Sequence, residues 1–312
     1  AYADILKKAA KELGDIYKTT GDYIEKLPGD ELNAFGSEWY ILGLARSGRK
    51  VSDDYYKAIE KYVSENIDEN GRLDEKRATD NAKLVLVLSA LDKDVTDVGG
   101  HDLLKALSDM DYVTQQGLSG AIYALLAFDC RGYDIPSADK NVEQTSREGL
   151  VKYILDKQLK DGGWAYSGDK AEPDMTAMAL QALAAYYKTD AKVKEAADKA
   201  VTCLSKLQNT TGGYDSYGSV NSESAAQVIT ALTALGIDPD NDARFVKNGA
   251  SVLDSLCGFY VDGGGFRHVS DGKLDPTATA QGYYALAAYY RFAGSQTALY
   301  DMTDLDTVEK AA

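Results

Sequence analysis

Two kinds of helical pattern alternate along the chain. One kind is amphipathic, with charged residues on one face and Leu, Ile, Val or Ala on the other, which is typical of a helix that is exposed on one side. These segments are DILKKAAKELGDIYK (4–18), DDYYKAIEKYVSEN (53–66), HDLLKALSDM (101–110), SREGLVKYILDKQ (146–158), VKEAADKAVTCLSKLQ (193–208) and RFVKNGASVLDSLCGFY (244–260).

The other kind is rich in alanine and apolar on nearly every face, which predicts helices that are buried on most sides. These segments are SEWYILGLARSG (37–48), NAKLVLVLSALD (81–92), LSGAIYALLAFD (118–129), TAMALQALAAYY (176–187), AAQVITALTALG (225–236) and TAQGYYALAAYY (279–290). Their equivalent positions are about 48 residues apart on average. The alternation predicts helices throughout and no strand of useful length.

A glycine turn separates the two kinds of helix and recurs along the chain. The turns read IDENGRL (67–73), QLKDGGW (158–164), QNTTGGY (208–214) and YVDGGGF (260–266). In each of them the fifth residue is Gly, and the seventh is Leu, Trp, Tyr or Phe. Gly162 and Gly212 are 50 residues apart, and Gly212 and Gly264 are 52 apart, whereas the third repeat has lost its glycine. Such a period indicates a repeat architecture.

Six repeats of one amphipathic and one apolar helix predict an all-α fold, the (α/α)6 toroid, as a single domain over residues 1–312. In this double-layered barrel six inner helices pack closely through their alanines, and six outer helices surround them. An open solenoid would pair its helices in the same way. The uncharged inner layer and the lack of a polar capping repeat favour closure into a ring.

Composition narrows the classes of partner. The 49 acidic and 34 basic residues give a net charge of −15, which argues against nucleic acid and anionic membrane surfaces. No apolar run reaches the roughly 18 to 20 residues that a membrane span needs, so we expect no membrane insertion.

Cys130, Cys203 and Cys257 have no CxxC spacing, and there are only two histidines. We therefore expect no metal and no other cofactor. The oligomeric state stays open.

The glycine turns resemble those of the terpenoid cyclase and protein prenyltransferase superfamily. QLKDGGW agrees with the Q-x-x-x-G-x-W repeat of squalene and hopene cyclases at every defined position, and QNTTGGY agrees with Tyr in place of Trp. The resemblance extends over essentially the whole chain through the repeat pattern. It implies the same toroidal fold, but a fold does not by itself specify a function.

Residues 173–302 are most similar to Gram-positive bacterial surface proteins with prenyltransferase and squalene oxidase repeats. The similarity lies in stretches such as PDMTAMALQALAAYY, NSESAAQVITALTALGIDP and DGGGFRHVSDGK. It implies an extracellular or cell-wall-attached protein from which this chain is one excised domain, with 303–312 as a linker. Such relatives often carry a domain related to one in the vitamin B12 carriers intrinsic factor and transcobalamin, so a corrinoid-like ligand is among the candidates.

The zinc site of protein prenyltransferases is incomplete in this sequence. Those enzymes bind zinc through an Asp, a Cys and a His in their late repeats, because the metal activates a thiolate. The matching stretch GGFRHVSDGKLDPTATA carries Asp275, but Thr277 stands at the Cys position and His268 lies too early. The sequence therefore argues against zinc-dependent prenyl transfer.

The acid motif of squalene and hopene cyclases is also incomplete. These enzymes protonate an alkene with the middle residue of Asp-x-Asp-Asp-Thr, which needs a neutral acid in a dry pocket. EPDMT places Glu172, Asp174 and Met175 at the three acidic positions. The middle acid is kept and the last is lost. Alternatively, Asp174 only stabilises the helix dipole, which is worth about 0.3 to 1 kcal/mol.

Polar and aromatic residues recur on one face of the apolar helices, at positions i, i+4 and i+7. A buried polar group costs a few kcal/mol unless it finds a partner. The stripe therefore predicts the wall of a central cavity, and the alternative is a filled core whose side chains bond to one another. The candidate ligand-binding residues are Trp39, Lys83, Gln116, Tyr123, Asp174, Gln181, Glu223, Gln227, Gln281 and Tyr284.

The sequence favours a ligand-binding or interaction module over an enzyme. A polar wall with aromatic rings suits a small polar molecule, a saccharide or a peptide segment. The alternative is an enzyme that uses Asp174 and Glu223, either as a terpenoid-cyclase-like protein or as a lyase or hydrolase with a carboxylate pair. The sequence places no His or Tyr beside these two acids.

Overall fold

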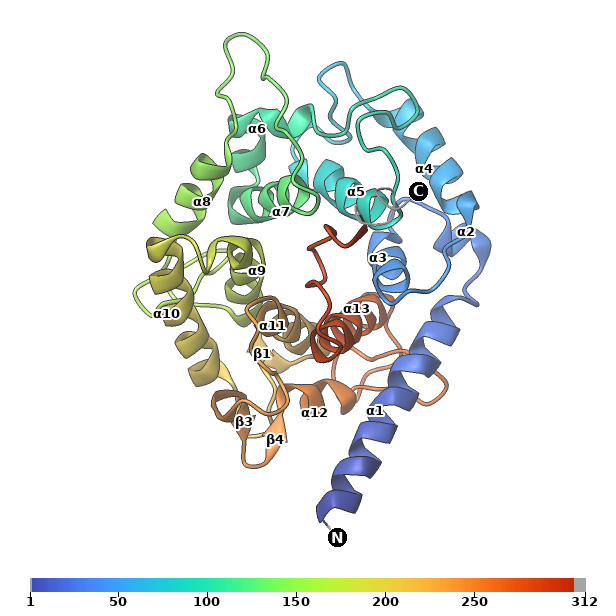
Figure 1. The fold of residues 1–312 in the computed structure, drawn as a ribbon, viewed down its shortest axis with the longest axis vertical. Helices are drawn as coiled ribbons and strands as arrows, with labels where there is room; N and C mark the ends of the chain where they lie inside the picture. Colours follow the sequence, from blue (N-terminus) through green and yellow to red (C-terminus); the bar gives the residue numbers. More distant parts are fainter. Residues whose placement is uncertain (1, 306–312) are drawn as a thin grey trace.

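Six helices form an inner ring in the computed structural model, which describes residues 2–305, with side chains from Glu12 onward (Figure 1). They are α3 (Glu38–Arg46), α5 (Ala78–Ala90), α7 (Gly117–Asp129), α9 (Pro173–Leu183), α11 (Ser222–Ala234) and α13 (Pro276–Ala293). Each packs against the next along the chain, and α13 packs against α3. The ring is therefore closed, which confirms the predicted toroid and excludes the open solenoid.

A second layer of helices lies outside this ring (Figure 1). It consists of α1 (Tyr2–Ile24), α4 (Asp53–Asn66), α6 (Met110–Gln115), α8 (Arg147–Asp156), α10 (Ala191–Leu207) and α12 (Val252–Cys257). Side chains of Ser52, Ser146 and Asp190 accept hydrogen bonds from the first turns of α4, α8 and α10. A single-turn helix, α2 (Gly29–Leu32), joins α1 to the inner helix α3.

The third outer element differs from the helix predicted at 101–110. The chain forms one 3₁₀ turn, η1 (Ala106–Ser108), and then α6. The Asp109 carboxylate accepts the backbone N–H of Tyr112 and caps α6, which therefore begins at Met110, the last residue of the predicted region. Hydrophobic periodicity continued through this position, but the backbone of Asp109 is extended, so no helix runs through it.

The sixth outer element is also shorter than the predicted helix at 244–260. A 3₁₀ turn, η3 (Ala243–Phe245), leads into a hairpin of β3 (Val246–Lys247) and β4 (Ala250–Ser251), and α12 follows. Asn248 and Gly249 form the turn with φ of 51° and 83°, as expected for Asn-Gly in a two-residue hairpin loop. A second hairpin joins β1 (Asp215–Ser216) to β2 (Ser219–Val220). The sequence missed both hairpins.

The repeated glutamine and glycine of the turns have one structural role. The Gln158 side chain donates to the carbonyl oxygens of Gly162 and Ala196, each at 2.8 Å, and so ties its turn to the next outer helix. Gln208 does the same one repeat later, at 2.9 Å to Gly212 and 2.7 Å to Phe245. Both glycines have positive φ, which side-chain-bearing residues rarely adopt. The motif is therefore a structural joint between repeats.

The segment after α13 crosses the ring at the carboxyl ends of the inner helices (Figure 1). Leu299, Tyr300 and Met302 are buried there, and the Met302 N–H donates to the Cys130 carbonyl at 2.8 Å. One more 3₁₀ turn, η2 (Ala184–Tyr186), extends α9 toward this end. The segment therefore closes one end of the toroid and leaves the amino-terminal ends of the inner helices at the other.

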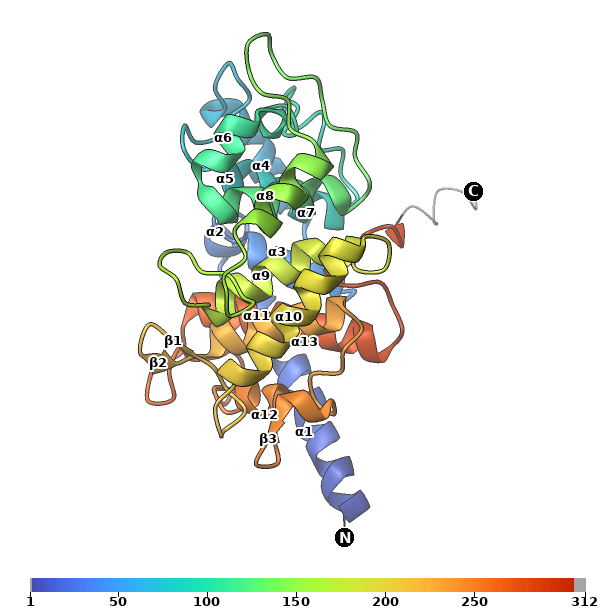
Figure 2. The ribbon, with the colours of Figure 1, turned by 90° about the vertical axis from the view of Figure 1, so that its left-hand side faces the viewer.

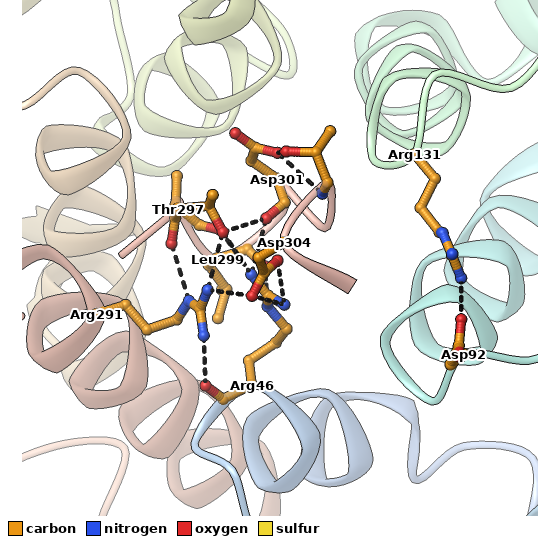
Figure 3. Close-up of polar contacts among 10 residues, drawn as sticks. Arg46, Asp92, Arg131, Arg291, Thr297, Leu299, Asp301 and Asp304 are labelled. Carbon is orange, nitrogen blue, oxygen red and sulfur yellow. Dashed lines mark hydrogen bonds and ion pairs between the residues drawn. The ribbon is translucent and has the colours of Figure 1, made fainter. Parts of the chain in front are cut away.

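Two buried arginines hold this segment in place (Figure 3). Arg46, at the end of α3, donates to the carbonyl oxygens of Leu299, Ala298 and Asp301 at 2.8 to 3.2 Å. Arg291 of α13 donates to the carbonyl and the hydroxyl of Thr297. Both guanidiniums also pair with the Asp304 carboxylate. Of the linker predicted at 303–312, residues 303–305 therefore lie against the toroid, and 306–312 are outside the described residues.

Candidate functional site

The amino-terminal ends of the inner helices surround the open end of the toroid. Six of the candidate residues are partly exposed there, and the other four are buried. The partly exposed ones are Trp39, Lys83, Asp174, Glu223 and Gln281, together with Gln116 at the start of α7. The buried ones are Tyr123, Gln181, Gln227 and Tyr284, with exposures of 1 to 9%. We call the partly exposed set, and the space it borders, the mouth.

Below the mouth, amide side chains from three neighbouring helices bond to one another. Gln181 of α9 donates to the Gln227 side chain at 2.9 Å and to its backbone carbonyl at 3.1 Å. Gln227 of α11 in turn donates to Gln281 at 2.9 Å and to the Tyr284 hydroxyl at 2.6 Å, both on α13. This layer agrees with the filled-core alternative, because its polar groups satisfy each other.

An aromatic cluster lies beside this layer. The Trp39 ring is 5.7 Å from that of Tyr123 and 5.9 Å from that of Tyr284, measured between centroids, and the second contact is edge to face. The Lys83 ammonium is 5.8 Å from the Trp39 ring centroid. Burial raises the pKa of Tyr123 and Tyr284, so both stay neutral. Trp39 keeps part of its surface exposed, which makes it the aromatic floor of the mouth.

Gln116 and Asp174 bond to different neighbours at the rim. The Gln116 amide accepts the Thr79 N–H at 3.0 Å and donates to the Thr79 hydroxyl at 2.9 Å. One Asp174 oxygen accepts the Ser216 hydroxyl at 2.9 Å, whereas its other oxygen, Oδ1, is buried and has no hydrogen-bond partner. An unpartnered buried acceptor costs about 1 to 3 kcal/mol. Oδ1 is therefore enclosed by the protein without a partner.

Glu223 has a neighbour that the sequence did not predict. Its carboxylate lies 2.8 and 2.9 Å from Nδ1 of His268 and accepts the Ser222 hydroxyl at 3.0 Å. His268 stands on the loop before α13, and the Ser222 N–H donates to its backbone carbonyl at 3.0 Å. The inference that no His lies beside the two acids was wrong. The sequence did contain a signal for this contact. His268 follows directly on the glycine turn YVDGGGF, and the equivalent turns of the other repeats border the same end of the ring.

Glu38 is a further acid at this end, in the first turn of α3, and sequence reasoning did not select it. Burial raises the pKa of its carboxyl group, although a hydrogen bond from the Gly36 N–H, at 2.7 Å, acts in the opposite direction. Asp80 of α5 is likewise raised in pKa by burial, although Arg77 pairs with it at 3.0 Å. Acidic side chains therefore border the mouth on several sides.

Comparison with known proteins establishes the fold. No protein-family model matches the sequence, and no curated protein matches it. Among solved structures, protein geranylgeranyltransferase-I from Candida albicans, in complex with GGPP, superposes with a TM-score of 0.57 at 13% identity, over 89% of this chain and 91% of that one. The ent-copalyl diphosphate synthase from Streptomyces platensis superposes with a TM-score of 0.53 at 18% identity, over 83% of this chain and 50% of that one.

The chain is an α/α toroid, the fold that it shares with these two solved structures. It spans half the length of the cyclase that it resembles. At these identities the likeness concerns the fold alone. The function has to be argued from the residues of this toroid.

The chemistry of the described residues differs from that of a zinc-dependent transferase. Among residues 2–305, no three His, Cys, Asp or Glu side chains lie together as a metal would require. Burial raises the pKa of Cys130 and Cys257 to about 12, so neither thiol is a ready nucleophile. Asp275 caps α13 by accepting the Ala278 N–H at 2.8 Å, which is a structural role. Within the same residues, no helix is long and apolar enough to cross a membrane.

A separate pocket of about 360 Å³ lies at the closed end, between the carboxyl-terminal segment and α7, α9 and α11. Gln181 borders it, together with Tyr300. Gln181 therefore belongs to the glutamine layer and also borders the pocket at the closed end. The structure brings Trp39, Tyr123 and Tyr284 together as one cluster, but it separates them from Gln116, which pairs with Thr79.

Proposed function

We propose that this toroid is a ligand-binding module that takes a polar ligand at its mouth. The observation that carries the proposal is the partly exposed Trp39 ring, which Tyr123 and Tyr284 hold in place. A rigid aromatic surface with amide and carboxylate groups around it is typical of sites for saccharides and other polar ligands.

The glutamine layer makes a large hydrocarbon a poor ligand. A terpene would need a dry apolar chamber inside the ring, whereas Gln181, Gln227 and Gln281 occupy this depth with amides. Separating these amides would leave several buried donors and acceptors unpaired, at about 1 to 3 kcal/mol each. The proposal therefore places the ligand above the layer, at the mouth. It also includes an extracellular or cell-wall-attached location, on the sequence resemblance alone.

Replacing Trp39 by alanine is expected to weaken ligand binding at least tenfold, because the aromatic floor is lost. Titration calorimetry measures the affinity, because both variants lack the tryptophan at the mouth and the only other tryptophan, Trp164, is fully buried in a turn. The probes are panels of neutral oligosaccharides and short peptides. Trp39→Phe is the matched control and should retain most of the affinity. Equal binding by Trp39→Ala and the unchanged protein would contradict the proposal.

A hydrolase or lyase is the second candidate, and the contact of His268 with Glu223 favours it. A carboxylate that orients an imidazole is a common arrangement for proton transfer. We expect Glu223→Gln to abolish any hydrolysis of the bound oligosaccharide while leaving its affinity within about threefold. Product analysis by chromatography measures the first quantity and fluorescence titration the second. A wild-type protein that binds an oligosaccharide without cleaving it would exclude this candidate for that substrate.

A further inference from the structure

Two tyrosines on the loops at the mouth expose most of their side chains to solvent. Tyr166 is 71% exposed and Tyr217 is 84% exposed, whereas Leu207, on the outer helix α10, is the only other large apolar side chain classed as exposed among the described residues, at 37%. Rings so exposed contribute almost nothing to burial on folding. Two such rings at one end of the toroid therefore indicate a surface that contacts a ligand or a partner.

The loops that carry both tyrosines are anchored at the start of α9. The Tyr166 N–H donates to the Glu172 carboxylate at 3.0 Å. Ser216, which precedes Tyr217, donates its hydroxyl to the Asp174 carboxylate at 2.9 Å. Figure 2 shows the loop before α9 and the β1–β2 hairpin on the same face of the toroid. The rings thus flank two carboxylates, one of which keeps an unpartnered oxygen.

The backbone of Tyr217 is strained for an aromatic residue. It occupies the first position of the turn between β1 and β2 with φ of 54°, followed by Gly218 at 87°. The second hairpin of this chain has Asn248 and Gly249 at the same positions, which is the usual pair there. A left-handed conformation costs a side-chain-bearing residue about 1 kcal/mol or more. The backbone conformation of Tyr217 therefore destabilises the hairpin, and its exposed ring gains no stabilisation from burial.

A groove of about 900 Å³ leads away from Tyr166 along the rim. Its walls include Gln158 and Leu159 on one side and Gln115 and Gln116 on the other. Gln116 and Gln158 already bond within the protein, whereas Gln115 is exposed, and an amide can donate to and accept from hydroxyl groups. The groove thus offers room and hydrogen-bonding partners for a ligand longer than one that fills the mouth alone.

We propose that Tyr166 and Tyr217 stack on the sugar rings of an uncharged oligosaccharide, whose hydroxyls donate to Glu172 and Asp174 and whose chain follows the groove toward Gln116. This inference rests on the proposed function and names its ligand class. Sugar rings have apolar faces edged by hydroxyl donors, which matches exposed rings beside carboxylate acceptors. The net charge of −15 opposes an anionic glycan or an acidic peptide.

Tyr217→Gly is the most informative variant, because it removes the ring and relieves the positive φ, so loss of binding cannot be ascribed to unfolding. The probes are maltohexaose, cellohexaose and chitohexaose, with polygalacturonate as the anionic comparison and an aromatic, proline-rich peptide as the rival ligand. Titration calorimetry is carried out on the wild type, Tyr166→Ala, Tyr217→Gly, Trp39→Ala and the control Leu207→Ala. We expect at least one hexasaccharide to bind, tenfold or more weakly in each tyrosine variant and unchanged in Leu207→Ala.

The outcomes separate this inference from the proposed function. If Trp39→Ala loses binding while both tyrosine variants keep it, the mouth binds the ligand and the tyrosine pair does not. The inference is then overturned, and the proposed function stands. If the peptide binds and no hexasaccharide does, the ligand class is wrong. If none of these probes binds at 10 mM, the inference is likewise overturned. Stronger binding of polygalacturonate than of the neutral sugars would also contradict it.

Discussion

Replacing Arg46 by methionine is expected to lower the free energy of unfolding by about 3 to 5 kcal/mol. The Arg46 side chain is only 2% exposed, and its guanidinium bonds to three carbonyl oxygens of the carboxyl-terminal segment and to Asp304. Methionine fills similar volume but leaves those acceptors without their donor. The buried carbonyls then bear the cost of desolvation, and residues 294–305 should become accessible to protease. Urea denaturation and limited proteolysis measure the two effects.

Arg244→Met is the matched control for this prediction. Arg244 pairs with Asp242 at 2.7 Å, but its side chain is 51% exposed, and such pairs contribute about 0 to 1 kcal/mol. Arg291→Met should act in the same direction as Arg46→Met, because both guanidiniums hold Asp304 and the Thr297 hydroxyl. The double variant should lose less than the sum of the two. Similar stabilities for Arg46→Met and Arg244→Met would refute the role given to the buried arginines.

Replacing Trp164 by alanine is expected to cost at least 3 to 5 kcal/mol. Trp164 is fully buried at the joint before α9, its indole N–H donates to the Ile154 carbonyl at 2.7 Å, and its backbone N–H donates to the Thr176 hydroxyl at 2.9 Å. Alanine leaves a cavity between α8 and α9 and also orphans the Ile154 carbonyl. The midpoint of urea unfolding, followed by circular dichroism, measures the loss.

Tyr166→Ala is the control for Trp164→Ala, since it changes an aromatic residue two positions later in the same loop. Its side chain is 71% exposed, so the free energy of unfolding should change by less than about 0.5 kcal/mol. Trp164→Phe should recover part of the stability, because Phe266 fills the equivalent position two repeats later. A loss in Trp164→Ala no larger than that in Tyr166→Ala would show that the joint does not hold the repeats together.

The fold could be predicted largely because its signals are local and repeated. Gln158 and Gln208 make the same pair of hydrogen bonds, and Trp164, Tyr214 and Phe266 are all fully buried. Each repeat thus reports the same geometry, so a period of about fifty residues is visible without any structure. The predictions failed where one capping residue or one turn overrode the periodicity, as at Asp109 and at the Asn248 hairpin.

The candidate site was predictable only in its outline. Spacing along each helix correctly selected side chains that face the ring axis, and Trp39, Tyr123 and Tyr284 do meet there. Spacing could not say whether amides from neighbouring helices reach a ligand or each other, because that depends on the distance between helices. Gln181, Gln227 and Gln281 reach each other.

The sequence by itself determined the alternation of inner and outer helices and the glycine joints, because each follows from periodicity within one repeat. It favoured closure into a toroid, which the packing of α13 against α3 then decided. Only the tertiary structure decided that His268 meets Glu223, that the segment after α13 closes one end, and that the loops of Tyr166 and Tyr217 are both anchored at the start of α9. These contacts join residues far apart in the chain through loops of irregular path. No local pattern encodes them, since they depend on how all six repeats pack around one axis.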